Sequence, residues 1–249
     1  MTELQTPPAL IAERAPAYRY AAYFAPAAES AWGMAGAHWL GRDAFRDAPL
    51  PQPVVAGLTS EEMRKLTGTP RRYGWHATLK APFQLAADVN VEQLVALLRT
   101  LCRGMQPLVM PSLEVRRIDD FLALLPAGDE AQIARIHQVA SVCVTGLQPL
   151  AQALSHEALE RRRQAGLTAQ EERYLLRWGY PYVLGRFRFH MTLSGSLHGV
   201  SDATVEQLRD AATAHFAHLP PCELDAVAVF TEPAPGADFV ALQRLMLGA

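Results

Sequence analysis

Two short runs that pair a histidine with a threonine are the parts of this 249-residue chain best suited to chemistry. They read His76-Ala77-Thr78-Leu79 and His190-Met191-Thr192-Leu193. An imidazole exchanges a proton near neutral pH, and a threonine hydroxyl can donate a hydrogen bond to a charged oxygen. At ordinary composition, Thr-Leu follows a given histidine at this spacing by chance about once in two hundred. Two copies among eight histidines therefore indicate a functional pair.

The residue types suit an in-line displacement at phosphorus. Two imidazoles on opposite sides of a phosphodiester can act as general base and general acid, while hydroxyls and cations stabilise its equatorial oxygens. Either histidine alone is more simply a structural residue of a strand, and the paired occurrence reverses that preference. We predict His76, Thr78, His190 and Thr192 as catalytic residues, and the sequence leaves open which histidine is the base.

Polar and apolar residues alternate through both histidine runs, which predicts two strands with one polar face each. The predicted polar faces hold Arg72, Gly74, His76, Thr78 and Lys80 in the first run, and Arg186, Arg188, His190, Thr192 and Ser194 in the second. Cations beside the histidines can hold a phosphate. We therefore expect Lys80, Arg186 and Arg188 to bind substrate, together with Tyr73 at the start of the first run.

The same order of landmarks occurs twice along the chain. Thr59 and Thr168 each stand three residues before a glutamate, which is the pattern of a capping box at a helix start. Helices are then predicted over 91–102 and 203–216, and Asp-Phe-x-Ala-Leu at 120–124 and 238–242 predicts a closing strand in each half. Further predictions are a strand over 18–24 and helices over 27–40 and about 129–146. The repetition indicates an internal duplication.

Net charge and the lack of a long apolar run limit the kinds of partner that we expect for this chain. The net charge is −2 at pH 7, with 23 basic and 25 acidic residues, so we expect no general attraction to nucleic acid or to an anionic membrane. No apolar run approaches the roughly 20 residues of a membrane span, and no signal-peptide pattern is present, so we expect a cytoplasmic protein. An anionic ligand must then be held by local groups.

Metal and cofactor motifs are missing from the sequence. Cys102, Cys143 and Cys222 are far apart and suit buried structural thiols, and His215 with His218 lacks acidic partners at ligand spacing. P-loop, dinucleotide-binding and nucleophile-elbow motifs do not occur. We expect no metal and no cofactor. The run Arg161-Arg162-Arg163 is most simply a solvated helix face, with a phosphate-binding role as the alternative.

The doubled motif resembles that of the 2H phosphoesterase superfamily, which is defined by two copies of His-x-Thr/Ser-x. More closely, three runs look like the bacterial DUF1045 branch. These are Tyr-Gly-Trp-His-Ala-Thr-Leu-Lys-Ala-Pro-Phe at 73–83, Arg-Trp-Gly-Tyr-Pro-Tyr-Val at 177–183 and Phe-Arg-Phe-His-Met-Thr-Leu at 187–193. The resemblance covers nearly everything after the first 17 residues.

The resemblance implies a duplicated, bilobal α+β fold, in which two antiparallel sheets form a V-shaped groove with helices on the outer faces. In this chain we expect a loose tail over 1–17 and a single domain over 18–249. We expect one lobe over about 18–146 and the other over about 165–249, joined by a helical segment over 147–164. This division leaves room for strands of one lobe to join the sheet of the other.

The leading functional hypothesis is metal-independent hydrolysis of a small cyclic phosphodiester. The superfamily includes cyclic phosphodiesterases and RNA 2′-5′ ligase-like enzymes, and this branch is associated with phosphonate utilisation, so a ribose cyclic phosphate is the implied substrate. Two alternatives stay open: processing of RNA ends, and a non-catalytic module that binds a phosphorylated metabolite. The oligomeric state is not predicted.

Overall fold

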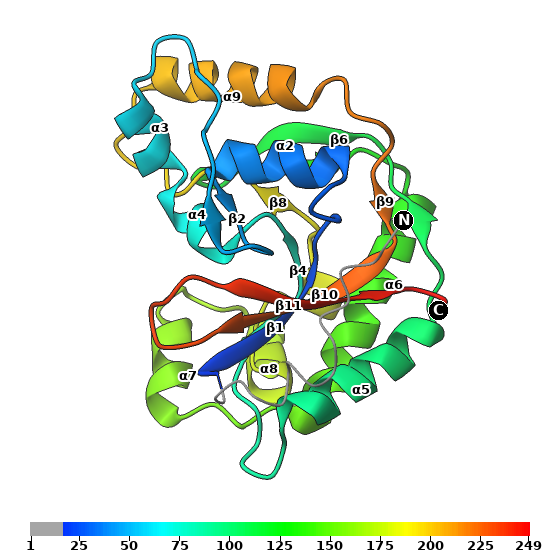
Figure 1. Ribbon diagram of the computed structural model, residues 1–249. Helices are drawn as coiled ribbons and strands as arrows, with labels where there is room; N and C mark the ends of the chain where they lie inside the picture. Colours follow the sequence, from blue (N-terminus) through cyan, green and yellow to red (C-terminus); the bar gives the residue numbers. More distant parts are fainter. Residues whose placement is uncertain (1–16) are drawn as a thin grey trace.

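A computed structural model describes residues 17–249, which are built around one seven-stranded antiparallel sheet (Figure 1). From edge to edge its strands are β11 (Val240–Met246), β10 (Ala226–Glu232), β1 (Arg19–Phe24), β4 (Ala77–Phe83), β8 (Met191–Thr192), β7 (Phe121–Pro126) and β6 (Leu113–Ile118). Two small sheets pair β2 (Arg42–Asp43) with β3 (Ala48–Pro49) and β5 (Leu108–Val109) with β9 (Glu223–Leu224). The predicted tail lies, except for its last residue, outside the described residues.

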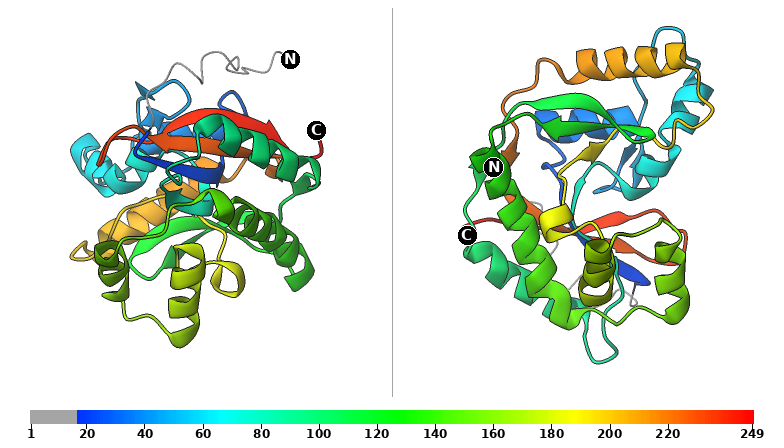
Figure 2. Two further views of the ribbon diagram at one scale, coloured as in Figure 1. Left: turned by 90° about the horizontal axis from the view of Figure 1, so that it is seen from below. Right: turned by 180° about the vertical axis from the view of Figure 1, so that it is seen from behind.

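The α+β class is confirmed, whereas two separate large sheets are not found in residues 17–249. The reason is that β4 and β8, which follow the two histidines, pair with each other through Ala77 and Met191. This short contact joins the four strands β11-β10-β1-β4 to the three strands β8-β7-β6. Figure 2 shows the hairpin of β6 and β7, in green, well apart from β10 and β11 in orange and red.

Eight α-helices and two turns of 3₁₀ helix accompany the strands in residues 17–249. The longer ones are α2 (Ala31–Leu40), α5 (Val91–Arg103), α6 (Glu130–Leu147), α8 (Ala169–Trp178) and α9 (Asp202–Phe216); the shorter ones are α3 (Ser60–Leu66), α4 (Gly68–Tyr73) and α7 (His156–Arg163). Turns of 3₁₀ helix occur at η1 (Gln148–Leu150) and η2 (Leu184–Arg186). Helix α5 contacts β10 and β11, α6 contacts β4, and α9 contacts β6. None of these helices is both long and apolar enough to cross a membrane.

Local sequence signals account for most of these elements. Both predicted capping boxes are present, with Thr59 accepting from Glu62 N and Thr168 from Glu171 N, and each satisfies backbone donors that a helix start leaves free. Helix α5 buries a stripe with helical spacing, which consists of Leu94, Val95, Leu98 and Cys102. Apart from shifts of a few residues at their ends, the helices and strands predicted outside the histidine runs are confirmed.

The histidine runs themselves are less regular than predicted. Residues 68–73 form α4 instead of strand, Gly74 turns the chain with a φ of 77°, and β4 begins only at Ala77. Just before the second run, Leu184 has a φ of 50° within η2, and in the run itself β8 comprises only two residues. An alternating pattern does not distinguish a strand from an extended loop. Each histidine therefore lies immediately before its strand.

Helix α2 holds both histidine segments. Gly36 lets the helix approach the indole of Trp75, which a Cβ at this position would overlap. Trp39 is fully buried, and its Nε1 donates to the carbonyl of Leu193 at 2.9 Å. Because Trp75 precedes His76 and Leu193 follows Thr192 in the chain, one rigid helix fixes the two motifs relative to each other.

Strands from the two halves of the sequence are interleaved in the sheet. Strand β1 pairs with β10, and β7 pairs with β8. The backbone N–H of Phe239 donates to Arg72 O at 2.8 Å, and that of Leu193 donates to Leu122 O at 2.8 Å. Each closing run thus contacts the histidine segment of the other half. The lobe boundaries stay a prediction.

Candidate active site

The pairing of β4 with β8 brings the two motifs together. Its register sets Ala77 opposite Met191, and both residues are almost completely buried, at 1% and 0% exposure. On either side of this pair in an antiparallel arrangement, His76 lies across from Thr192 and Thr78 across from His190. Side chains alternate along extended chain, so these four face away from the buried pair. We call them the His/Thr square; cross-strand Cβ atoms in such pairs lie about 5 Å apart.

A cavity of about 440 Å³ opens over this square. His76, Thr78 and Thr192 line it, and Phe121, a fourth lining residue, has its ring centroid 5.7 Å from that of His190. The wall is completed by Arg19, Tyr23, Thr69, Pro70, Tyr73, Ala81, Pro82, Arg162, Tyr180, Ser194, Gly195 and Ser196. The volume suits a small molecule.

Both imidazoles are oriented in the same way. The Nδ1 atom of His76 lies 2.9 Å from Gly74 O, and that of His190 lies 2.9 Å from Arg188 O. A carbonyl only accepts, so each Nδ1 carries the hydrogen and each Nε2 is left as the atom that takes up or gives a proton. Thr78 Oγ1 lies 3.2 Å from His76 Nε2 and can donate to it. The two rings therefore present equivalent nitrogens for proton transfer.

The surroundings of His76 keep its ring neutral. Tyr23 of β1, itself 1% exposed, stacks on the ring with the centroids 3.8 Å apart and an interplanar angle of 23°. Burial is the main cause that lowers the pKa of His76 to about 4, and the nearby His190 acts in the same direction, while the hydrogen bond to Gly74 opposes them. Burial also lowers the pKa of His190. Both rings are accordingly neutral at pH 7 in the free protein.

Of the four predicted substrate-binding residues, Tyr73 lines the cavity and the three cations do not. Lys80 Nζ donates to Gln148 Oε1 at 2.9 Å, and Arg186 forms an ion pair with Glu171 at 2.7 Å. The side chain of Arg188 is 57% exposed and lies 3.8 Å from Asp119.

Lys80 leaves the predicted polar face because the β1–β4 register shifts. Tyr23 pairs with Thr78 and Ala22 with Lys80, so Leu79 is an extra residue on β4. Such a bulge reorients the residues beside it. Leu79 and Lys80 are consequently both buried, at 2% and 3% exposure.

Residues that the sequence did not assign to the site also line the cavity. Arg19, Tyr23 and Tyr180 carry no motif, and Arg162 belongs to the arginine run whose simplest interpretation was a solvated face. Within that run Arg163 forms ion pairs with Glu160 and Glu172, whereas Arg162 is part of the cavity wall. The arginine run is thus divided between a surface network and the site.

Comparison with known protein families supports the resemblance to the DUF1045 branch. Residues 78–240 match the family model described as "Protein of unknown function (DUF1045)". The chain belongs to this DUF1045 family. The match begins at Thr78, the second residue of β4, so it includes β8 and much of the cavity wall, whereas His76 and Ala77 lie before it.

Two curated relatives of this DUF1045 chain are both named ribose 1,5-bisphosphate phosphokinase PhnN. The one from Janthinobacterium sp. (strain Marseille) is 40% identical over 230 residues, which are 91% of this chain and 50% of the relative. The one from Laribacter hongkongensis (strain HLHK9) is 34% identical over 221 residues, 89% of this chain and 50% of the relative. The chain spans about half the length of the curated relatives it matches.

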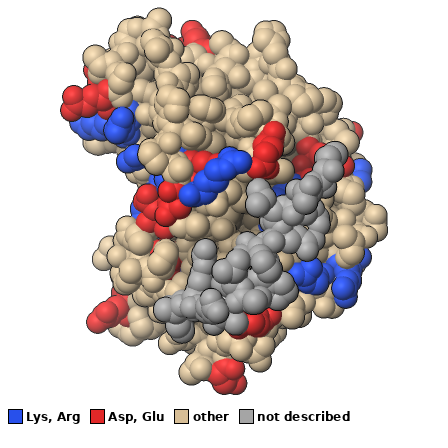
Figure 3. Space-filling model, in the orientation of Figure 1, with Lys and Arg blue, Asp and Glu red and all other residues tan. Residues whose placement is uncertain are grey.

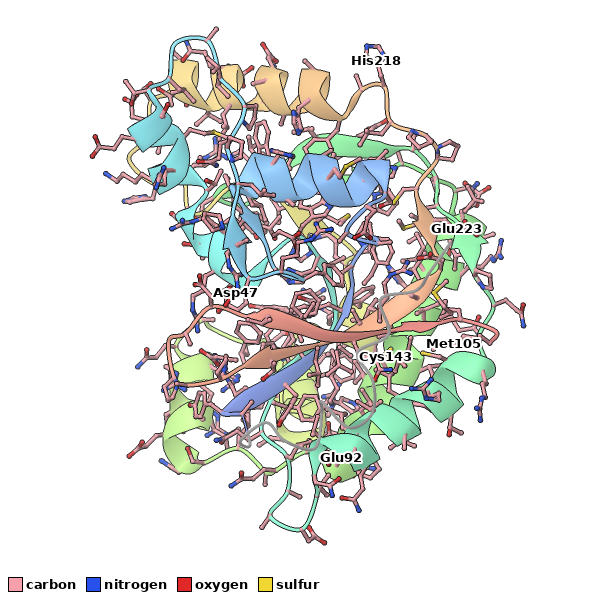
Figure 4. All side chains as sticks on the ribbon, viewed as in Figure 1. Asp47, Glu92, Met105, Cys143, His218 and Glu223 are labelled. Carbon is pink, nitrogen blue, oxygen red and sulfur yellow. The ribbon has the colours of Figure 1, made fainter. Side chains whose placement is uncertain are left out.

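Possible metal ligands are dispersed in the described part of the DUF1045 chain. Residues 17–249 contain no group of three or more His, Cys, Asp or Glu side chains placed to hold a metal ion. Cys102, Cys143 and Cys222 are buried and free, as predicted. His215 Nε2 lies 2.9 Å from Ala35 O, and His218 is exposed in the turn that follows α9 (Figure 4).

Proposed function

We propose that this DUF1045 protein is a 2H-type phosphoesterase that hydrolyses a small cyclic phosphodiester to a phosphomonoester. The observation that carries the proposal is the β4–β8 register, which sets His190 across from Thr78 beside a cavity that His76, Thr78 and Thr192 line. On the face seen in Figure 3, acidic and basic side chains are interspersed among other residues, without a broad basic patch on the described part. A small substrate therefore suits the site better than a polynucleotide does.

The reaction needs one proton acceptor and one proton donor. Nε2 of His76 takes a proton from water as the water oxygen forms a bond to phosphorus. The P–O bond on the opposite side breaks, and the leaving alkoxide takes the proton from Nε2 of His190. Thr78 and Thr192 donate hydrogen bonds to the equatorial oxygens, where negative charge accumulates. One water is added, and a later proton exchange with solvent restores both imidazoles.

The roles follow from the surroundings of the two rings. His76 is stacked on Tyr23 and has a pKa of about 4, so it is available as the base across the neutral and mildly acidic range. His190 must be protonated to act as the acid. The anionic phosphodiester stabilises its imidazolium when it binds, since an opposite charge favours the charged form.

This assignment predicts a bell-shaped dependence of kcat/KM on pH with an acidic optimum. Activity falls as the pH drops through about 4, because His76 is then protonated in the free enzyme. It also falls as the pH rises through the pKa of His190, which burial holds below its ordinary 6.5. Initial rates at low substrate from pH 3.5 to 9 measure both limbs. A kcat/KM that climbs steadily to an optimum above pH 8 contradicts the assignment.

The relatives' names suggest the class of substrate. We propose that it is a ribose cyclic phosphate, because those relatives are named for a ribose bisphosphate and the family resemblance implies phosphonate utilisation. We further place the named kinase activity in the half of the relatives that this chain does not match, because the chain has no G-x-x-x-x-G-K-[ST] motif for holding a nucleotide triphosphate.

Phosphorus NMR on the purified protein tests the proposal. The panel contains ribose and nucleoside cyclic phosphates, a short RNA with a 2′,3′-cyclic end, and ribose 1,5-bisphosphate with ATP. We expect opening of a small cyclic phosphate, no change when EDTA is added, and no phosphorylation of the bisphosphate. Opening of the RNA end alone points to RNA processing. Binding of a cyclic phosphate without product points to a sensor and overturns the catalytic proposal.

A further inference from the structure

A second cavity of about 340 Å³ adjoins the one over the His/Thr square. The two share the wall residues Arg19, Ala81, Pro82, Arg162 and Tyr180. A ligand whose reacting group lies on the square can therefore extend past Arg19 and Arg162 into the second cavity.

The second cavity is strongly cationic although the chain as a whole has a net charge of −2. Four basic side chains line it, namely Arg19, Lys80, Arg161 and Arg162, against one acidic side chain, Glu157. Two of the four, Arg19 and Arg162, also line the cavity over the His/Thr square. This excess of positive charge matches the charge of an anionic group on a ligand.

Three of these cations lack a carboxylate partner in the described part of the chain: Arg161, which is exposed, and the more buried Lys80 and Arg162. Lys80 is 3% exposed, and the acceptors that its Nζ reaches are Gln148 Oε1 at 2.9 Å and Val144 O at 3.4 Å. Arg162 donates from Nη1 to Ala158 O at 3.2 Å, and no carboxylate of residues 17–249 pairs with it. Its other guanidinium nitrogens are available to a ligand.

Arg19 differs because one side of it is already held. Its Nε donates to the buried Glu232 at 2.5 Å, and Arg19 also lines the wall that the two cavities share. The ion pair fixes the arginine without using its whole fork of donors. Arg19 is thus positioned to bind an anion jointly with Arg162.

Burying a cation without an anion is unfavourable, so the surroundings of Lys80 and Arg162 disfavour their charged forms. Burial lowers the pKa of Lys80 to about 8. Burial, followed by repulsion from Arg161 and Arg19, lowers the pKa of Arg162. A bound anion relieves both effects, because it supplies the missing opposite charge.

We propose that Arg162 and Arg19, with Lys80 deeper in the second cavity, bind a second phosphate group of the substrate. The inference rests on the proposed function and narrows it: the substrate is a phosphorylated sugar that carries a cyclic phosphodiester at one end and a phosphomonoester at the other. Arginine suits this role because its planar fork matches two phosphate oxygens.

The test compares ribose 1,2-cyclic phosphate with and without a 5-phosphate. The wild type is expected to have a kcat/KM about 10- to 100-fold higher for the 5-phosphate compound, the range of one or two charge-assisted hydrogen bonds. In Arg162→Met that ratio falls close to one, and in Lys80→Met it falls in the same direction. The matched control is Arg173→Met, which removes an exposed arginine on α8 that lines neither cavity and keeps the wild-type ratio.

The outcomes separate the second phosphate site from the proposed reaction. If the wild type opens both compounds equally, or if Arg162→Met keeps the wild-type ratio, the phosphate site is wrong and the hydrolase proposal stands. If the wild type opens neither compound, the hydrolase proposal fails, and calorimetry with ribose 5-phosphate decides the site. Binding that Arg162→Met weakens at least tenfold supports the site, and lack of binding to the wild type overturns it.

Discussion

Replacing either His76 or His190 with alanine is expected to lower kcat/KM for the best cyclic phosphodiester by about 10²- to 10⁴-fold, the range for loss of a general acid or base. His76→Ala removes the Nε2 that accepts the proton of water, and His190→Ala removes the donor to the leaving oxygen. Because proton transfers at both ends belong to one displacement, the double variant should lose less than the product of the two single losses. Steady-state rates measure all three.

The control for this series is His218→Ala, which removes an exposed histidine in the turn that follows α9 (Figure 4). It is expected to retain the wild-type rate, and matching circular dichroism spectra exclude loss of fold in the other variants. The proposed mechanism is wrong if either single variant, His76→Ala or His190→Ala, turns over at the wild-type rate.

Glu232→Ala is expected to lower the free energy of unfolding by about 3 kcal/mol, the lower end of the range for removing one partner of a buried ion pair. Glu232 is 0% exposed at the end of β10 and binds Arg19, Arg72 and the backbone N–H of Gly236, the last at 2.9 Å. Its removal leaves two guanidinium groups facing each other without a carboxylate. The expected loss in the free energy of unfolding lies at the lower end of that range because both arginine side chains are 26% exposed and water screens their charges.

Denaturant unfolding of wild type and variant measures this loss. Glu223→Ala is the matched control, because Glu223 of β9 is exposed (Figure 4) and an ordinary surface substitution changes stability by less than about 0.5 kcal/mol. A loss below about 1 kcal/mol for Glu232→Ala means that the Arg19–Glu232–Arg72 cluster contributes little to folding. It also means that Arg19 is not held at the cavity wall by this contact.

Local patterns in the sequence predicted the parts of the fold that depend on neighbouring residues. The capping glutamates Glu62 and Glu171 satisfy backbone donors within a single turn, so their spacing alone indicates a helix start. The buried stripe of α5 follows from its helical period in the same way. The doubled His-x-Thr motif predicted the four residues that the β4–β8 register brings together.

Other features depend on contacts between distant segments and were not predictable from the pattern. The bulge at Leu79 arises from the register with β1, and it moves Lys80 from the predicted polar face to the second cavity. The single large sheet depends on Ala77 meeting Met191 across more than a hundred residues of chain. Arg162, which lines both cavities, could not be distinguished from Arg161 and Arg163 without knowing which way α7 faces.

If water displaces an alkoxide at phosphorus between His76 and His190, phosphorus NMR in water enriched in oxygen-18 will detect the step. Wild-type protein is expected to open the cyclic phosphate to a phosphomonoester with one oxygen-18 on phosphorus, while His76→Ala and His190→Ala leave the cyclic signal almost unchanged over the same time. A ring-opened product without the label on phosphorus, or equal opening by the variants, contradicts this mechanism.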